Sequence, residues 1–212
     1  MKNLFTAIRG NDLAEVKSII EKDAMLIASV SKGAPKKDIG QSPLQVALKA
    51  ASTEIVNYLL DNGADVNFIE SEEISTYRAP VIHDAINRAI KNSRWNVNSA
   101  GKLEVFSTKE KADESFAVLK RVIEMGADVN AKDSYGNSCL DRACLESRQI
   151  LPFEGSDDRI LTEELKADLS RIFALLMSCG ADLSYVNPNT EKTCLESYKA
   201  EKVGLFLNKD NV

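Results

Sequence analysis

Apolar residues recur along the chain at the spacing of one helix face. Three apolar pairs each follow another apolar residue by three positions: Leu59-Leu60 after Val56, Val122-Ile123 after Leu119, and Leu176-Met177 after Phe173. Such positions share one side of an α-helix, so each group predicts the end of an amphipathic helix. Related strings follow the three groups: Gly63-Ala64-Asp65-Val66-Asn67, Gly126-Ala127-Asp128-Val129-Asn130 and Gly180-Ala181-Asp182-Leu183-Ser184. Each glycine suits the left-handed conformation that ends a helix.

A second string alternates with the first and predicts the start of another helix. In Ser42-Pro43-Leu44-Gln45-Val46-Ala47, serine is the N-cap and proline takes the first helical position. Related strings are Pro80 to Ala85, Ser138 to Ala143, Thr193 to Tyr198 and, more weakly, Leu4 to Ala7. The two strings together predict repeated pairs of helices.

The two strings and their spacing resemble the ankyrin repeat, a helix-turn-helix unit of about 33 residues. Ala47 lies 16 positions before Gly63, and Gly126 lies 17 before Ala143. Those separations fit an undisturbed ankyrin unit. The resemblance implies an all-α fold, an ankyrin-repeat solenoid of stacked helix-turn-helix units with β-turn fingers. It also gives the one histidine, His83, a structural position at which the ring bonds loop backbone.

Five units are expected in a single domain of residues 1–212, with the first and last as polar caps. Their boundaries fall near 1–37, 38–74, 75–132, 133–186 and 187–212. The third and fourth units are too long, because Ala85 lies 41 positions before Gly126 and Ala143 lies 37 before Gly180. We therefore expect insertions between their helices at about 92–115 and 145–168.

The composition narrows the function classes. The chain is 44% hydrophobic with a net charge of -5, and it has no clustered basic stripe, so we expect no nucleic-acid partner. It has no apolar stretch long enough for a membrane and no signal peptide, which predicts a cytoplasmic protein. Four cysteines without metal-ligand spacing read as buried thiols. With one histidine and no nucleotide or hydrolase motif, we expect no catalytic residues, no cofactor and no metal.

The resemblance implies a concave groove formed by the finger tips and the exposed face of each first helix. Tyr77, Arg88 and Tyr135 are the leading partner-binding candidates, because Tyr and Arg dominate binding hot spots. Asn137 and Glu146 occupy further finger and helix positions of the same groove. An equal alternative is that each tyrosine only packs on the neighbouring finger.

The two insertions distinguish this chain from a plain repeat array. The first contains Trp95 and the segment 103–106, whose pattern predicts a strand or hairpin arm. Its apolar residues either cover the stack or meet a partner, which makes Trp95 a further candidate. The second holds seven carboxylates against three basic groups, so it either steers a basic partner or lengthens both helices as solvated surface.

A non-enzymatic protein-protein interaction module is the expected function, with an unidentified protein partner and a monomeric state. The alternative is a small-molecule binder or enzyme with a pocket beneath the 92–115 insertion, lined by Arg94, Trp95 and Phe106. Self-association through the same insertion is a third possibility.

Overall fold

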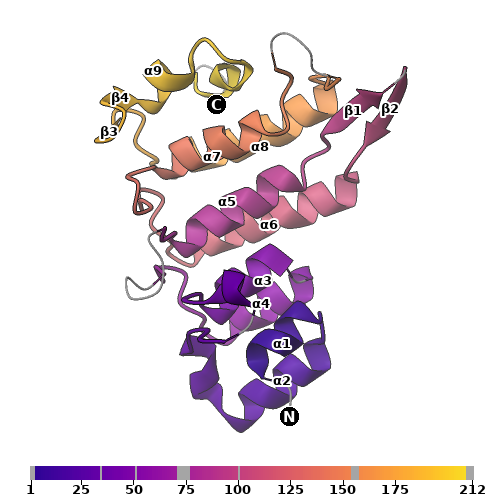
Figure 1. Ribbon diagram of the computed structural model, residues 1–212, viewed down its shortest axis with the longest axis vertical. Coiled ribbons are helices and arrows are strands. Elements are labelled where there is room, and N and C mark those ends of the chain that lie inside the picture. The colour runs from indigo at the N-terminus through magenta and orange to yellow at the C-terminus, as the bar shows by residue number, and fades with distance from the viewer. Residues whose placement is uncertain are drawn as a thin grey trace.

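The computed structural model describes residues 3–33, 35–50, 52–70, 77–99, 101–153 and 158–208. Five successive helix pairs follow one another along the long axis (Figure 1). The pairs are α1 (Leu4–Arg9) with α2 (Leu13–Lys22), α3 (Pro43–Ala50) with α4 (Thr53–Asp61), α5 (Val81–Lys91) with α6 (Lys109–Glu124), α7 (Cys139–Arg148) with α8 (Glu163–Ser178), and α9 (Cys194–Tyr198) with the 3₁₀ helix η3 (Lys202–Phe206). Each range expected for a unit encloses one pair, while the boundaries themselves stay a prediction.

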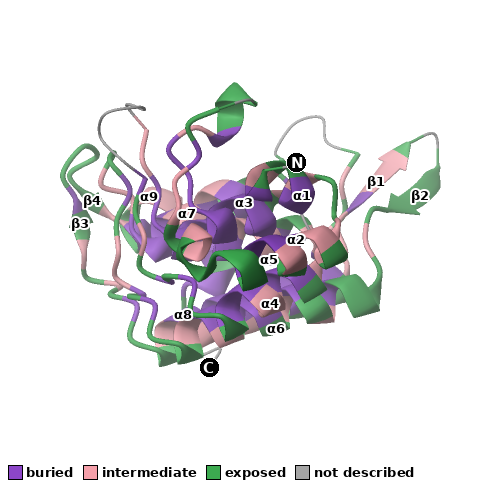
Figure 2. Cartoon of the chain, turned by 90° about the horizontal axis from the view of Figure 1, so that it is seen from below, coloured by how far each residue is buried: buried purple, intermediate pink, exposed green. Residues whose placement is uncertain are grey.

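The helices form two layers. In one layer α1, α3, α5, α7 and α9 pack side by side, and in the other α2, α4, α6, α8 and η3 do so. Figure 2 shows the buried residues concentrated between these layers. The short 3₁₀ helices η1 (Ala24–Ala28) and η2 (Lys36–Asp38) lie in the first connection. The all-α repeat fold predicted from the sequence is confirmed.

Small residues lie where the first-layer helices approach one another. Ala7, Ala47, Ala85 and Ala143 are completely buried. Larger apolar side chains fill the space between the layers, among them Leu59, Ile86, Leu119 and Phe173, which are also completely buried. One continuous core therefore runs through all five helix pairs.

The repeated glycine string has the same conformation in its three copies. Gly63, Gly126 and Gly180 have positive φ angles of 86°, 94° and 94°, which only glycine adopts without steric cost. The alanine after each glycine is buried. The aspartate then accepts a hydrogen bond from the backbone N–H two residues later, as Asp65 does from Asn67 at 2.8 Å. In these three units the glycine ends the second helix, and the aspartate bond then turns the chain toward the next finger.

The first insertion is an antiparallel hairpin of β1 (Asn96–Ser99) and β2 (Lys102–Val105). The strand predicted over 103–106 is therefore present, shifted by one residue toward the N-terminus. The hairpin projects from the edge of the stack opposite the fingers (Figure 1). At its base the rings of Trp95 and Phe106 stack with centroids 4.2 Å apart, and Trp95 packs on the core.

Both insertions include helical residues. Helix α6 begins at Lys109 and α8 at Glu163, and each has 16 residues, against 9 in α4. The expected insertions at 92–115 and 145–168 therefore contain the first turns of these second helices, because Thr108 and Thr162 cap them earlier than in a plain repeat. Residues 154–157 of the second insertion lie outside the described residues.

The hairpin and the second insertion contact each other. Arg94 forms an ion pair with the buried Asp168 of α8, with Nε 2.8 Å from Oδ2. The buried Asn96 amide donates to the carbonyl oxygen of Ile160 at 2.8 Å and accepts the N–H of the same residue at 3.0 Å. The insertions of units three and four therefore form one joined structure beside the stack.

Candidate functional site

The finger before α7, residues 132–138, is ordered by one buried carboxylate. Asp133 accepts hydrogen bonds from the N–H groups of Tyr135 (2.9 Å) and Asn137 (3.0 Å) and from the Asn137 amide (2.9 Å). Burial alone would raise the pKa of Asp133, but the hydrogen bonds from Asn137 and Arg142 lower it below its ordinary value. The ionised carboxylate thus fixes the backbone that carries Tyr135.

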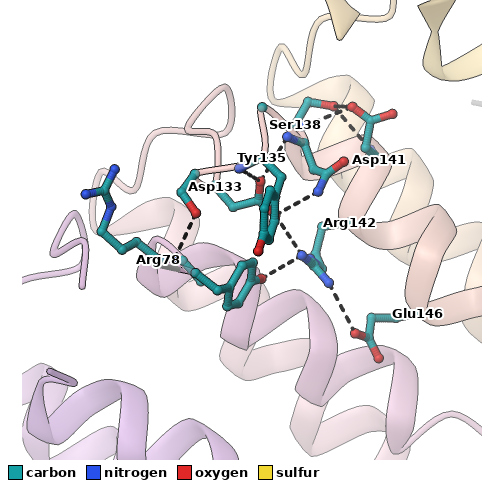
Figure 3. A network of polar contacts seen from close by, with 12 residues as sticks. Arg78, Asp133, Tyr135, Ser138, Asp141, Arg142 and Glu146 are labelled. Atoms are coloured by element: carbon teal, nitrogen blue, oxygen red, sulfur yellow. Dashed lines mark hydrogen bonds and ion pairs between the residues drawn. The ribbon is translucent and has the colours of Figure 1, made fainter. Parts of the chain in front are cut away.

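Tyr77 and Tyr135 stack on one another between adjacent fingers. Their ring centroids are 5.7 Å apart with an interplanar angle of 21°. Arg142 of α7 donates through Nη2 to the Tyr77 hydroxyl at 2.6 Å and to Asp133 Oδ2 at 2.7 Å (Figure 3). We call Tyr77 and Tyr135 the tyrosine pair.

Backbone contacts join these two fingers as well. The Arg78 N–H donates to Ser134 Oγ at 3.0 Å, and the Ser134 N–H donates to the Arg78 carbonyl at 3.0 Å (Figure 3). Because both fingers are held at the backbone, the stacked rings are positioned before any partner arrives. Tyr77 is half-buried, and burial raises the pKa of its hydroxyl. Tyr135 remains 53% exposed.

The finger before α9 continues the row. Tyr185 donates its hydroxyl to the Gly136 carbonyl at 2.9 Å, and Asn189 donates to the Tyr135 carbonyl at 2.6 Å. The Asn187 amide lies 3.2 Å from Asn137 Oδ1. Asn137, a predicted binding residue, therefore bonds to Asp133 in its own finger and to Asn187 in the next one.

Two predicted helix positions are held within the stack. Arg88 donates to the Leu48 carbonyl and to Thr53 Oγ1, both at 3.2 Å, so it bridges units two and three. Glu146, expected on an exposed face, is 6% exposed. The expectation of exposure is wrong for Glu146 because Lys91 and Arg142 approach its carboxylate to 3.4 and 3.5 Å. Arg142 lies four positions before Glu146 on the same helix, whereas Lys91 is remote in the sequence.

Trp95 does not join the tyrosine pair, since it lies at the base of the hairpin on the opposite edge of the stack. None of three sizeable hollows in the described parts of the chain is lined by residues 92–115. One of them, of about 590 Å³, is mainly apolar and lies between α1, α2 and η1. Another, of about 880 Å³, lies between α7 and the last unit.

The third hollow, of about 660 Å³, lies between α1, α3 and the first two fingers, on the side of the groove. We call it the basic hollow, since four of its lining side chains are cations. Its residues are Arg9, Lys36, Lys37, Ile39, Gln41, Lys49, Glu70 and Tyr77. Apart from Lys36 and Lys37, these cations are far apart in the sequence, so no basic stripe marks the hollow. A signal was present, however, because Arg9 and Lys49 each lie two positions after the repeat alanine.

Buried carboxylates lie beneath the cations of the basic hollow. Asp38 is completely buried and forms an ion pair with Arg9. Lys49 Nζ lies 3.4 Å from Glu70 Oε1 and 3.2 Å from Asp84 Oδ2. Burial raises the pKa of Asp84 to about 6, although Lys49 opposes the shift.

His83 is completely buried. Burial and the nearby Arg142 lower its pKa to about 4, so the ring is neutral at pH 7. The backbone of Ala131, in the loop before α7, interacts with the ring and favours its protonated form, which is the kind of loop contact that the resemblance implied. No hydrogen bond of ordinary geometry reaches either ring nitrogen among the described residues. A neutral, enclosed imidazole has no access to a substrate.

Other chemistry is sparse in the described residues. They contain no group of three or more His, Cys, Asp or Glu side chains placed to hold a metal ion. No helix among them is both long and apolar enough to cross a bilayer. The four cysteines are free thiols, and three are buried as expected, while Cys179 at the end of α8 is exposed.

Comparison with known proteins places similarity along the helix pairs. Residues 39–70 match the family model of the ankyrin repeat. An ankyrin repeat protein of Fowlpox virus (strain NVSL) is 31% identical over 135 residues, which are 60% of this chain and 20% of that protein. Alpha-latrocrustotoxin-Lt1a of Latrodectus tredecimguttatus is 30% identical over 114 residues, 52% of this chain and 8% of the toxin. The chain thus spans one fifth or less of the length of these relatives.

Proposed function

Since the chain is an ankyrin-repeat protein, we propose that it is a non-enzymatic module of the cytoplasm that binds a partner protein through its finger tips and groove. Ankyrin repeats are in general protein-protein interaction modules. The tyrosine pair is the centre of the proposed surface. Tyr135 combines an exposed ring with a backbone fixed by Asp133, and a rigid aromatic side chain loses little entropy when a partner covers it.

The stacking of Tyr135 on Tyr77 is compatible with both alternatives that the sequence left open, packing on the neighbouring finger and contact with a partner. The rings do pack on the neighbouring finger, yet about half of the Tyr135 side chain stays accessible. Arg142 supports the pair from the helix side, so the outward faces remain available for contact. Tyrosine is also one of the residue types enriched among binding hot spots.

The test compares two aromatic truncations of similar exposure. Tyr135→Ala removes the exposed finger ring, and Phe106→Ala removes a ring of 45% exposure from the hairpin. Each variant and the wild type, carrying the same tag, is used to retain proteins from a lysate of the source cell. We expect one protein that is retained by the wild type and by Phe106→Ala but lost with Tyr135→Ala. Tyr135→Ala should leave the melting temperature nearly unchanged, because the exposed ring contributes little to the core.

Two other outcomes redirect the proposal. Loss with Phe106→Ala but not with Tyr135→Ala would transfer binding to the hairpin and make Trp95 the next target. If the wild type retains nothing, sedimentation of the purified chain at increasing concentration tests self-association. If the chain does not self-associate, the small-molecule alternative is tested next.

A further inference from the structure

The basic hollow is a concentration of positive charge on an acidic protein. The chain carries a net charge of -5, yet four cations and one carboxylate line this single concavity. The residues come from two first helices, from η2 and from two fingers, so the fold and not a sequence run assembles them.

Two of the four cations are available for a ligand. Arg9 is committed to Asp38, and Lys49 to Glu70 and Asp84. Lys36 and Lys37 are exposed, and neither forms an ion pair with a described carboxylate. Their turn η2 directs its own acid, Asp38, inward toward Arg9. The two lysines therefore lie at the rim of the hollow, and Asp38, their neighbour in the sequence, does not neutralise them because it pairs with Arg9.

Gln41 adds an unused acceptor to the same hollow. Its amide donates through Nε2 to the Lys37 carbonyl at 3.3 Å, which fixes the orientation of the amide. Gln41 is 7% exposed, and its Oε1 is a buried atom with no hydrogen-bond partner among the described residues. A buried acceptor without a partner costs free energy, and a ligand N–H would relieve that cost.

We propose that the basic hollow binds an acidic peptide segment of the partner, with Lys36 and Lys37 pairing its carboxylates and Gln41 Oε1 accepting a backbone N–H. This inference rests on the proposed function and gives the chemistry of one part of its surface. Ile39 and Tyr77 in the lining supply apolar contact for the stems of the acidic side chains. Tyr77 also belongs to the tyrosine pair, so the hollow and the exposed ring of Tyr135 form a continuous surface.

A peptide fits these features better than a nucleic acid does. A phosphate backbone offers acceptors only, so it cannot satisfy Gln41 Oε1. Nucleic-acid affinity also depends on many cations arranged along a strand. Here the cations are confined to one concavity.

The test uses the full chain and N-acetyl hexaglutamate amide as the probe. Backbone amide resonances of the ¹⁵N-labelled protein are followed by NMR during titration at low salt. We expect saturable shifts at Arg9, Lys36, Lys37, Ile39 and Lys49, and weaker binding as salt screens the charges. Reversal of both rim charges, Lys36→Glu/Lys37→Glu, should weaken binding about ten-fold or more, given the worth of two exposed ion pairs.

The matched control is Lys166→Glu/Lys192→Glu, which reverses two exposed lysines on α8 and β4 (Lys192–Thr193), remote from the hollow. It changes the net charge equally and should leave binding nearly unaltered. Far-UV circular dichroism of each variant verifies that it is folded. Gln41→Met, which removes the acceptor at similar volume, should weaken binding about three-fold.

Three results would overturn the inference. The first is an absence of saturable shifts, and the second is equal weakening by both double variants. The third is tighter binding of a twelve-nucleotide oligothymidylate at the same residues, which would assign the hollow to nucleic acid. Each leaves the proposed function standing wherever Tyr135→Ala still abolishes partner retention. Conversely, suppose that hexaglutamate binds the hollow as expected while Tyr135→Ala leaves partner retention unchanged. That result would support the hollow as a binding site and reject the tyrosine pair.

Discussion

The side-chain amide of Asn67 donates through Nδ2 to the carbonyl oxygen of Gly126 at 2.9 Å, although 59 positions separate the two residues. Its Oδ1 accepts the N–H of Asp128, also at 2.9 Å. Asn130 repeats this arrangement one unit later with Gly180 and Asp182. In the first two copies, the last residue of the repeated glycine string thus joins its own helix pair to the next one.

Replacing Asn67 with alanine should remove both contacts between units two and three. Because the groups are exposed and water can replace the partners, we expect a loss of about 1–2 kcal/mol in the free energy of unfolding. Urea denaturation followed by circular dichroism measures the change. Ser184→Ala is the control, since among the described residues Ser184 bonds only to Asp182 in its own turn. An equal loss there would contradict the bridging role of Asn67.

Ala47→Leu should overpack the approach between first-layer helices. Ala47 is completely buried on α3, and added carbon atoms in a well-packed core cost about 1–3 kcal/mol. The same substitution at Ala167, an exposed residue of α8, should have little effect on thermal unfolding. An unchanged melting temperature for Ala47→Leu would show that the repeat register of unit two is wrong.

Asp84→Asn should change how stability depends on pH. Burial raises the pKa of Asp84 from 3.8 to about 6 in the folded chain, so the folded state holds this proton where the unfolded state has lost it. Stability from this group is therefore present below pH 4 and declines as pH rises toward 6. His83, whose pKa is lowered to about 4, acts in the opposite direction over pH 4 to 6.5, because the unfolded state binds its proton.

The difference between variant and wild type isolates Asp84, since His83 is present in both. The free energy of unfolding of Asp84→Asn minus that of the wild type should rise by on the order of 2–3 kcal/mol between pH 4 and pH 7. Lys49 and Glu70, the charges nearest Asp84, are common to both proteins. Urea titrations at pH 4, 5, 6 and 7 measure it, and a difference that does not vary with pH would refute the shifted pKa.

One thiol of four should react rapidly with a thiol reagent in the folded protein. Cys179 is exposed, whereas Cys139, Cys144 and Cys194 are buried. Burial also raises the pKa of Cys139 and of Cys144, which suppresses the reactive thiolate. Spectrophotometric counting with a disulfide reagent should find one fast group, which Cys179→Ser removes. Two or more fast groups in the wild type would contradict the burial of the other three thiols.

The helix pairs could be predicted from the sequence because their signals are local. Gly63 ends a helix through its own φ angle, and Ser138 starts one through a bond to Asp141 three residues later. The hairpin strand was predictable for the same reason. Tyr77 and Tyr135 could be placed on fingers from the repeat register alone, although their mutual stacking could not.

Features that depend on distant partners could not be predicted. Glu146 occupies an outward position in the repeat register, yet Lys91 from another helix pair approaches it and it is buried. The basic hollow depends on the longer first connection, whose η2 turn carries Lys36 and Lys37 to the side of Arg9 and Lys49. Only the folded path of that connection shows that the four cations share one concavity.

The bonds of Arg94 to Asp168 and of Asn96 to Ile160 make the coupling along the stack uneven. Helix pairs three and four share these contacts in addition to the packing of α5 on α7 and α8. When the chain is stretched from its two ends, the helix pairs are therefore not expected to unfold one at a time. Helix pairs three and four are expected to unfold together in a single step. Unfolding under force then shows fewer steps than there are helix pairs.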